Sequence, residues 1–458
     1  MSGLADSPAV RKRRRLPLWL LGMLVLLWFL SIADTVVRIH SAPLESWSAW
    51  RIADQELRLA EFEGTGFSGA LFDEKVRDRQ ELMQHWAAIL EKDPDPRSRS
   101  GAAVLWHLAG QAGKAAAVPV DGGDNPERMA LVASLLKGEE ADGYKLGNWG
   151  SLVAAGGETY WWEEQLFLRL ATGDETVLSD VAEASRARNE RCLHAAALGS
   201  WVDLAIAAGG ALFLAVYLWQ SRCRLRIGPV PAVFRKMDWR RVVAGVAIAE
   251  LLAFGLLVLL GVGLAGYQGW THEEFAIHDT IWRGASASFL MLVFFRRPRT
   301  AWRALHLNRA FSMKAVSGAV GLAVILAGIC WWLLPHGGEN LYGGGISPWT
   351  FGFPGLLFIL WSGCVVAPLF EEIVYRGFFF NALAARFGIW AGIVVANGVF
   401  AAIHAYGWND SISVFLFGVV SSVLYRMSGS LAASVICHAL LNFYIFTVTW
   451  WEFEATYG

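Results

Sequence analysis

The sequence predicts an all-α, polytopic membrane protein with about nine transmembrane helices and an extracytoplasmic helical insert domain. The prediction rests on composition, on the grouping of apolar residues and on loop charge. Of the 458 residues, 55% are hydrophobic and 17% are charged, whereas an ordinary soluble domain carries about 25% charged residues. This composition excludes intrinsic disorder, which requires low hydrophobicity. The net charge of −1 gives no basic field for nucleic acid, and five Cys cannot form a disulfide framework.

The first apolar run directly follows a basic segment. Arg11–Arg15 precedes Leu16–Ile32. A cleaved signal peptide begins in the same way, but its apolar region is shorter, about 7–15 residues, and a cleavage site between small residues follows it. Here the following residues offer only Ser41-Ala42 as a weak site, so we favour an uncleaved membrane anchor within residues 1–40.

Further apolar segments follow in series through the region 196–458, which we expect to form the membrane domain. Crossing the hydrocarbon core takes about 20 residues of helix, and shorter segments cross at a cost. The predicted segments are Ala196–Trp219, Val242–Ala265, Ile281–Phe295, Ala315–Leu334, Phe351–Ala385, Ile389–Ala405, Ser411–Tyr425 and Leu431–Trp451. With the N-terminal anchor, these segments account for the predicted transmembrane helices.

The loops between the segments predict the orientation of the chain. Loops 220–241 and 296–314 are rich in Lys and Arg, whereas the alternate loops 266–280 and 336–350 contain neither residue. Lys and Arg accumulate on the cytoplasmic side of a membrane. We therefore expect a multi-pass protein of the cell membrane with a cytoplasmic N-terminus and with residues 41–195 outside.

Residues 41–195 are polar and predict a domain of short helices. Apolar stripes, N-caps and stop signals predict helices over Asp73–Lys92, from Asn125-Pro126 to Lys137-Gly138, over Glu158–Ala171 and over Glu175–His194. Asp93–Pro96 is expected to end the first of them. Cys192 is the only Cys of this region, so an internal disulfide is excluded. No catalytic constellation stands here, and recognition, control of access and a plain spacer all remain open.

Charged side chains inside the apolar segments are the strongest functional signal. Each costs at least about 2.5–3.5 kcal/mol to insert, so such residues mark function by default. Glu372 and Arg376 are four residues apart, share a helix face and can form an ion pair. Glu371 points about 100° away from that face and is expected to have no partner nearby, which leaves it available for chemistry.

Two more pairs follow at the same spacing on the next apolar segments. Phe400 precedes His404 by four residues, and His438 precedes Asn442 by four. A single intramembrane His most often hydrogen-bonds a neighbouring helix. Three such pairs, close in sequence, favour a functional site over a structural one.

Together these residues indicate hydrolysis. Glu371 can take a proton from a water molecule that His404 shares or orients. His438 and Asn442 can supply donors to an oxyanion. One Glu with two His is also a zinc ligand set, so a divalent metal held by Glu371, His404 and His438 remains open, although the HExxH motif is absent.

A thiol nucleophile is the less favoured alternative. Cys364 and Cys437 lie on the same segments as the motifs. Cys437 directly precedes His438 and therefore faces another side of its helix. We interpret both cysteines as small apolar packing residues.

The three motifs together resemble those of the CPBP family of intramembrane proteases, with the pattern EExxxR, FxxxH and HxxxN. The matching residues are Glu371, Glu372, Arg376, Phe400, His404, His438 and Asn442. The family includes the eukaryotic Ras-converting CAAX prenyl endopeptidase and Abi-like bacterial homologues linked to bacteriocin self-immunity. The resemblance covers residues 350–451 and leaves residues 41–195 unexplained.

The resemblance implies a hydrolase that cleaves a membrane-associated protein or peptide within the lipid bilayer. In such proteases the first Glu and the first His are taken to activate water, here Glu371 and His404. The second His and the Asn, here His438 and Asn442, are taken to stabilise the oxyanion. Many members are labelled metalloproteases, although the part played by a metal has been argued both ways.

Two other functional classes remain open. A non-catalytic membrane scaffold or a bacteriocin-immunity-type factor could use the same fold to bind a partner. A transporter could relay protons through buried Glu and His, although no inverted repeat relates the halves of the chain. A protease should gather its Glu, His and Asn side chains in one place. Glu250, inside Val242–Ala265, is expected to hydrogen-bond a neighbouring helix rather than line the site.

Overall fold

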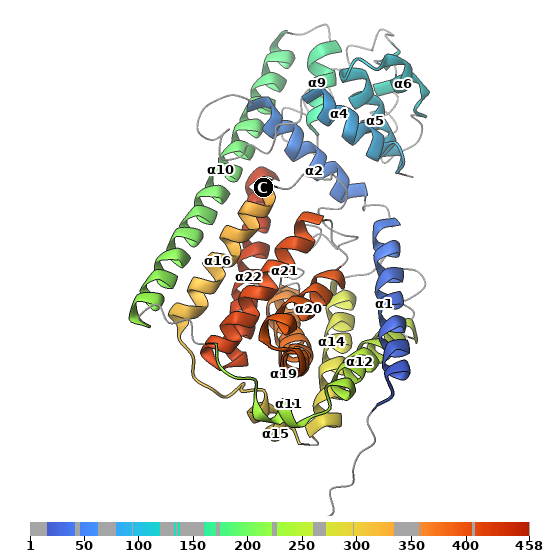
Figure 1. Ribbon diagram of the computed structural model, residues 1–458. Coiled ribbons are helices and arrows are strands. Elements are labelled where there is room, and N and C mark those ends of the chain that lie inside the picture. Colours follow the sequence, from blue (N-terminus) through green and yellow to red (C-terminus); the bar gives the residue numbers. More distant parts are fainter. Residues whose placement is uncertain are drawn as a thin grey trace, which may run out of the picture. The chain divides into compact units, whose positions relative to one another are not determined.

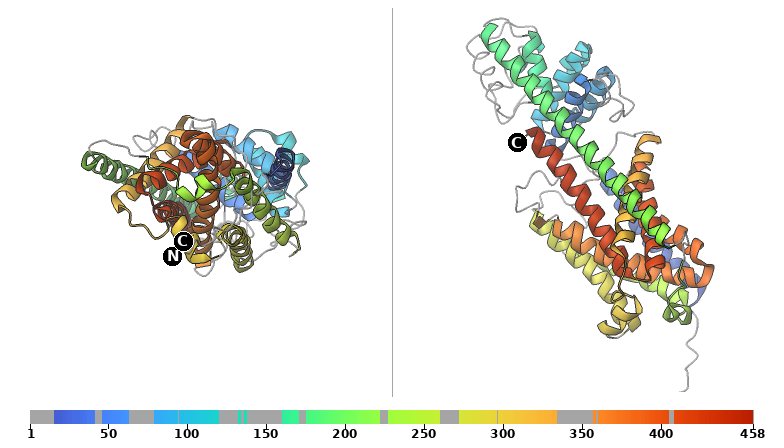
Figure 2. Two further views of the ribbon diagram at one scale, coloured as in Figure 1. Left: turned by 60° about the horizontal axis from the view of Figure 1, so that its bottom comes forward. Right: turned by 90° about the vertical axis from the view of Figure 1, so that its left-hand side faces the viewer.

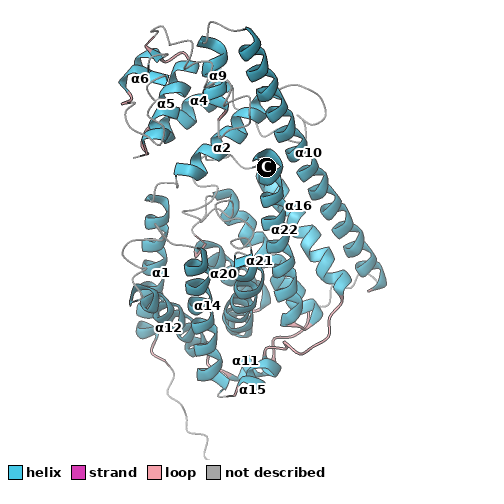
Figure 3. Cartoon of the chain, turned by 180° about the vertical axis from the view of Figure 1, so that it is seen from behind, coloured by secondary structure: helices cyan, strands magenta, loops and turns pink. Residues whose placement is uncertain are grey.

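The computed structural model describes residues 16–41, 46–62, 79–93, 95–119, 132–133, 136–137, 160–170, 175–221, 227–259, 272–295, 297–333, 357–358, 360–404 and 408–457. Within these ranges every regular element is a helix (Figures 1 and 3). The chain divides into two compact units. Unit 1 comprises Met1–Arg38, Gly209–Gly337 and Leu357–Phe443, and unit 2 comprises Ile39–Ala208, Gly338–Leu356 and Tyr444–Gly458.

Unit 1 is a bundle of apolar helices. Its elements are α1 (Leu18–Ser41), α11 (Ala232–Lys236), α12 (Trp239–Leu259), α14 (His272–Phe295), α15 (Pro298–Ala304), α16 (Met313–Leu333), η3 (Trp361–Val366), α18 (Ala367–Glu371), η4 (Glu372–Phe380), α19 (Asn381–Phe387), α20 (Ile389–Ala402) and α21 (Trp408–Ser428). Two longer helices, α10 (Glu175–Gln220) and α22 (Leu431–Tyr457), are divided between the units, and the last residues of α1 also fall in unit 2. Gly388 and Gly429 lie at positive φ and separate consecutive helices, where a side chain would be strained.

Apolar helices of membrane-spanning character confirm the membrane class of the protein. Three described helices are long and apolar enough to cross a bilayer, within Glu175–Gln220, Met313–Cys330 and Asp410–Ser428. Shorter apolar helices cover Leu18–Ala33, Ile389–Ala402 and Leu431–Thr447. The all-helical fold is therefore confirmed, while the number of transmembrane helices and the extracytoplasmic position of residues 41–195 stay predictions.

Two predicted segments differ in detail from the helices of the structure. Glu175–His194 and Ala196–Trp219 are parts of one uninterrupted helix, α10, which is 46 residues long (Figure 2). No Pro lies between them, and Gly199 alone does not end a helix. The segment Phe351–Ala385, expected to be one helix, contains the wide π-helical turns η3 and η4. Pro368, in the first turn of α18, has no N–H to donate, and η3 lies directly before α18.

The N-terminal anchor helix packs into unit 1. Trp28 of α1 is buried and meets Phe379 of η4 edge-on, with ring centroids 5.7 Å apart. The opposite face of α1 exposes Trp19, Leu26 and other large apolar side chains. A helix with one packed face and one exposed apolar face suits the edge of a bundle in lipid.

The two predicted cytoplasmic loops meet the turn between α21 and α22. Gly228 of the first loop donates to the carbonyl of Arg426 over 2.9 Å and accepts from its guanidinium. Ser430 donates to the carbonyl of Arg309, in the second loop, over 2.8 Å. The basic loops therefore share one end of unit 1, as loops on a common membrane side must.

Unit 2 contains small helices around an aromatic core. They are α2 (Ser46–Leu59), η1 (Ala60–Phe62), α4 (Arg79–Leu90), α5 (Pro96–Leu108), α6 (Ala112–Ala117) and α9 (Trp161–Leu170), with the first part of α10. Leu57, Leu90, Leu105, Trp161 and Phe167 are fully buried in this core. Helices α4 and α9 lie within the predicted ranges, while most of the helix predicted from Asn125 lies outside the described residues.

The segment Asp93–Pro96 has a second role that the sequence analysis missed. The Asp95 carboxylate accepts from the Arg97 amide over 2.7 Å, and Pro96 takes the first position of α5. An N-cap followed by Pro starts a helix, so this segment both ends α4 and begins α5.

A buried charge network joins α2, α9 and α10 in unit 2. Arg58 donates to Asp54 over 2.8 Å, to both carboxylate oxygens of Glu164 over 2.9 and 3.0 Å, and to Asn189 over 2.8 Å. Burial, the largest single influence, would raise the pKa of Glu164, but the charge and hydrogen bonds of Arg58, together with the charge of Arg188, outweigh it and hold that pKa below its ordinary value of 4.5.

Candidate active site

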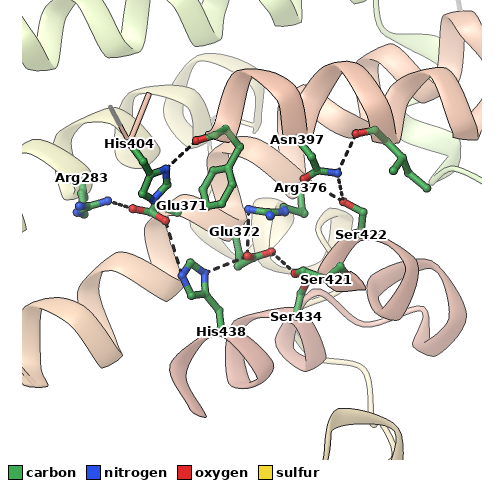
Figure 4. Close-up of polar contacts among 12 residues, drawn as sticks. Arg283, Glu371, Glu372, Arg376, Asn397, His404, Ser421, Ser422, Ser434 and His438 are labelled. Atoms are coloured by element: carbon green, nitrogen blue, oxygen red, sulfur yellow. Dashed lines mark hydrogen bonds and ion pairs between the residues drawn. The ribbon is translucent and has the colours of Figure 1, made fainter. Parts of the chain in front are cut away.

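The two neighbouring glutamates mark the junction between α18 and η4. Glu371 is the last residue of α18 and Glu372 the first of η4, and both side chains are buried. Successive side chains on a helical backbone point in different directions. The two carboxylates therefore meet different partners (Figure 4).

Glu372 lies at the centre of a buried ion pair. Its Oε1 is 3.2 Å from Nη1 of Arg376, which confirms the pair expected from their spacing. Its Oε2 accepts from Ser421 of α21 over 3.1 Å, and Nδ1 of His438 is 3.1 Å from Oε1. The Arg376 guanidinium lies over the ring of Phe400 at 4.0 Å. Both oxygens of Glu372 are therefore occupied by protein groups.

Glu371 has a partner that the sequence analysis did not foresee. Its Oε1 forms an ion pair with Nη1 of Arg283, on α14. Its Oε2 is buried, has no hydrogen-bond donor among the described residues and lies 3.9 Å from Nε2 of His438. The expectation that Glu371 lacks a partner is wrong, because helical spacing reveals only partners on the same helix.

Arg283 belongs to a polar stripe on α14. It donates to Asp279, one turn earlier, over 2.6 Å, and Ser362 of η3 donates to the other oxygen of Asp279. Asp279, Arg283 and Ser286 follow the helical period and lie on one face of α14. This spacing of polar residues was the sequence signal that could have identified Arg283 as part of the site.

The two histidines meet at one aromatic ring. The ring of Phe400 contacts that of His404 at 4.7 Å and that of His438 at 6.2 Å between centroids. Nδ1 of His404 is 2.7 Å from the Phe400 carbonyl oxygen, which can only accept a hydrogen bond. The hydrogen therefore resides on Nδ1, and Nε2 of His404 is the nitrogen left for Glu371, toward which the ring points (Figure 4).

The same argument applies to His438. An ionised Glu372 accepts only, so Nδ1 of His438 carries the hydrogen between them. Nε2 then faces Oε2 of Glu371 across 3.9 Å. His438 therefore lies between the two glutamates, bonded to one and facing the other (Figure 4).

Asn442 is tied to η3. Its side-chain amide donates to the carbonyl of Gly363 over 2.6 Å. The structure thus gathers Glu371, His404 and His438 together and fixes Asn442 through a backbone contact instead. One hydrogen of the Asn442 amide remains for another acceptor.

The residues as placed do not form a metal-binding cluster. Among the described residues, no group of three or more His, Cys, Asp or Glu side chains is arranged to hold a metal ion. Oε1 of Glu371 is paired with Arg283. The Nδ1 atoms of His404 and His438 are hydrogen-bonded to a backbone carbonyl and to a carboxylate. Metal binding by Glu371, His404 and His438 stays a prediction.

Glu250, Cys437 and two serines beside Glu372 make structural contacts. Ser286 of α14 donates to Glu250 of α12 over 2.7 Å, so Glu250 does hydrogen-bond a neighbouring helix. Cys437 is fully buried, as a packing residue would be. Ser421 and Ser434 share a hydrogen bond of 2.5 Å beside Glu372. Serines occur in many apolar helices, so their residue type alone gave no signal of this contact.

Gly418 allows α21 to lie against the Arg376 ion pair. A Cβ atom at this position would come within 2.5 Å of Oδ1 of Asn397 and within 2.9 Å of Nη2 of Arg376. A larger residue at this position would have to displace these two side chains. Asn397 in turn donates to Ser422 over 3.1 Å, which joins α20 to α21.

Comparison with known proteins agrees with the motifs. A family model described as type II CAAX prenyl endopeptidase Rce1-like matches residues 353–444, about a fifth of the chain, and this segment holds all six predicted site residues. An uncharacterized 24.3 kDa protein of Escherichia coli is 30% identical over 89 residues, 19% of this chain and 41% of that protein. The chain thus spans less than half the length of this relative. No solved structure matches the chain significantly. Over residues 353–444 the chain matches the Rce1-like family of type II CAAX prenyl endopeptidases, as its three motifs predicted.

Proposed function

We propose that this protein is an intramembrane endopeptidase that hydrolyses a peptide bond of a membrane-associated protein. The observation that carries the proposal is the environment of Glu371. Its Oε2 is buried, accepts from no described donor and faces Nε2 of His438 at 3.9 Å. A carboxylate oxygen and an imidazole nitrogen at this separation suit a small reactant held between them, and water is the reactant that hydrolysis requires.

Glu371 acts as the general base in this proposal. Its carboxylate takes one proton from water, and the water oxygen forms a bond to the carbonyl carbon of the substrate. The carbon–nitrogen bond then breaks, and Glu371 returns the proton to the leaving amine. The products are a new carboxyl terminus and a new amino terminus, and the enzyme regains its starting protonation. His404, whose Nδ1 is held by the Phe400 carbonyl, orients the water through Nε2.

His438 and Asn442 stabilise the oxyanion that forms on the substrate. The second amide hydrogen of Asn442 supplies one donor, since the first is used by Gly363. Nε2 of His438 donates when the ring is protonated, because the Nδ1 hydrogen goes to Glu372. A protonated His438 would lie between two carboxylates, which balance its charge. Donors aimed at the developing charge supply a large part of catalysis in acyl transfer.

Glu372 and Arg376 serve as the support of the site. Arg376 balances the Glu372 charge, and Glu372 holds His438 in one orientation. A hydrogen bond from the second ring nitrogen to a carboxylate fixes the tautomer of a catalytic histidine. Neighbouring carboxylates in different environments commonly divide roles in this way.

The setting of the site suggests the substrate class. The motif helices are apolar, and unit 1 exposes large apolar side chains such as Trp390 and Val394. A substrate must reach the site through lipid or from its surface, so we propose a lipid-anchored or membrane-spanning protein or peptide. In the proposed orientation the N-terminus is cytoplasmic and residues 41–195 are extracytoplasmic.

Reconstituted protein tests the proposal. Purified protein in lipid nanodiscs is incubated with membrane peptides that carry or lack a prenylated C-terminal cysteine, and products are identified by mass spectrometry. Glu371→Gln keeps the shape of the side chain but removes the base, so cleavage should fall at least about 100-fold. Equal products from both proteins would remove Glu371 from the mechanism. Absence of wild-type cleavage of every peptide would favour the non-catalytic scaffold.

A further inference from the structure

Helix α14 approaches the junction of α18 and η4 closely at one point. A Cβ atom on Gly284 would lie 3.7 Å from the ring of Phe370, the residue before Glu371. Gly284 directly follows Arg283 in sequence. Helix α14 therefore lies beside Phe370 at ordinary packing distance, and its Arg283 guanidinium reaches the Glu371 carboxylate.

The Arg283 guanidinium is fixed from both sides. Its Nε donates to Asp279 over 2.6 Å, and its Nη1 pairs with Glu371. Asp279 is itself held by Ser362, and 28% of the Arg283 side chain is exposed. A guanidinium held by two carboxylates, one of them anchored, has little freedom to turn.

The short element η3 makes contacts on both sides of the site. Ser362 of η3 begins the chain of contacts that runs through Asp279 and Arg283 to Glu371. Gly363, the next residue of η3, accepts from Asn442. Element η3 thus contacts both the residues that hold Glu371, the proposed base, and Asn442, the proposed oxyanion donor. Arg283 is the residue that contacts Glu371 directly.

This arrangement determines which oxygen of Glu371 can act. Arg283 holds Oε1, so the rotation of the carboxylate is fixed and Oε2 is directed at His438. We propose that Arg283 is a positioning residue that orients Glu371 for proton transfer, an inference that rests on the proposed peptidase function. Because a misplacement of about 1 Å can cost about 100-fold in rate, loss of this contact should reduce turnover rather than substrate binding.

The test compares Arg283→Ala, Arg283→Lys and Asp279→Asn on a membrane peptide that the wild-type protein cleaves in nanodiscs. Arg283→Ala should lower kcat about 100-fold and leave KM within about threefold. Arg283→Lys should retain more activity than Arg283→Ala, and added guanidinium ion should restore part of the activity of Arg283→Ala. Asp279→Asn keeps the charge of Arg283 and loosens its hold, so its loss should be smaller.

Controls separate positioning from folding. Arg303→Ala, at an exposed position on α15, should leave kcat unchanged. The thermal unfolding midpoint is measured for every variant, and Asp279→Asn carries the test when Arg283→Ala does not fold. A functional role predicts guanidinium rescue of kcat at a constant midpoint, which a contact important for stability alone would not show.

The outcomes distinguish this inference from the proposed function. If Glu371→Gln is inactive while Arg283→Ala and Asp279→Asn have wild-type kcat, the positioning role is wrong and the peptidase proposal stands. A rise in KM alone, or a loss of kcat that neither lysine nor guanidinium relieves, also overturns the positioning role. Wild-type cleavage by Glu371→Gln overturns the proposed function itself.

Discussion

Two adjacent glutamates in this protein differ in what holds them. Glu372 is fully engaged by Arg376, His438 and Ser421. Glu371 shares only one oxygen with Arg283 and keeps the other toward His438. A carboxylate whose two oxygens are both bonded to protein groups is suited to hold its neighbours in place. A carboxylate with one oxygen still able to accept a proton is suited to proton transfer.

At the residue scale, Arg376→Ala should reduce the amount of folded protein. The change leaves Glu372 as a buried carboxylate without its counter-charge, which typically costs about 3–5 kcal/mol. Fluorescence-detected size-exclusion chromatography of solubilised membranes measures the folded fraction. Arg386→Ala, at an exposed position on α19, is the matched control. A stable, fully active Arg376→Ala would mean that the ion pair contributes little.

The sequence predicted the local contacts of the site but not the distant ones. The spacing of Glu372 and Arg376 was sufficient, because residues four apart on a helix are neighbours. Arg283 and Ser421 come from α14 and α21, and helical periodicity does not say which helices pack together. Gly363 as the partner of Asn442 is a backbone contact, and side-chain patterns carry no signal for it.

At the scale of the elements, small residues decide how closely helices pack. Gly210 of α10 and Gly321 of α16 meet backbone to backbone in unit 1. A Cβ atom on either would come within 2.3 Å of the Cα atom of the other. Close backbone approach through small residues is a common way for membrane helices to associate.

Gly321→Leu should therefore separate α10 from α16 and destabilise the protein. No flexible side chain can move aside, because the obstructing atoms belong to the backbone of Gly210. The thermal unfolding midpoint in detergent measures the effect, and Gly328→Leu on the same helix is the control, since its Cβ atom would meet nothing within 4 Å. Equal midpoints for both variants would contradict the close contact.

The buried network of unit 2 predicts a dependence of stability on pH. The folded-state pKa of Glu164 lies below its ordinary value of 4.5, so the stabilisation is present above that pH and is lost as the pH falls toward the lowered pKa. Hydrogen exchange in α2 and α9, followed from pH 7 to pH 3, should show protection falling below about pH 4.5. Glu164→Gln should lower protection at neutral pH and weaken this dependence. An unchanged profile in Glu164→Gln would exclude Glu164 as the cause.

The positions of single helices were easier to predict than where one helix continues into the next or changes to a π turn. Apolar stripes located α4 and α9, and continuous apolar segments located α12 and α16, to within several residues. The continuity of α10 and the wide turns η3 and η4 were missed, because a change from polar to apolar composition does not break a helix and no simple residue pattern marks a π turn.

At the scale of the whole molecule, loop charge predicts the orientation. The first and second basic loops both contact the turn between α21 and α22, so they share one end of unit 1. Reporter fusions test which side of the membrane that end faces. A periplasm-type reporter fused after residue 120 should be active, and one fused after residue 230 should be inactive, because Lys and Arg remain inside. The reverse pattern would overturn the orientation.

The membrane class, the all-helical fold and the family resemblance were within reach of the sequence. Each depends on composition or on short local motifs, which one chain displays directly. The division into two units was less accessible. Helices α10 and α22 each belong to both units, and a continuous helix gives no sequence signal of a boundary within it.

We propose that this protein cuts other membrane proteins with Glu371 as its base. The most direct measurement maps new protein termini, by mass spectrometry, in cell membranes that contain equal amounts of wild-type protein or Glu371→Gln. We expect a set of termini in membrane-associated proteins that appears with the wild-type protein and disappears with Glu371→Gln. Identical sets of termini from the two membranes would contradict the claim.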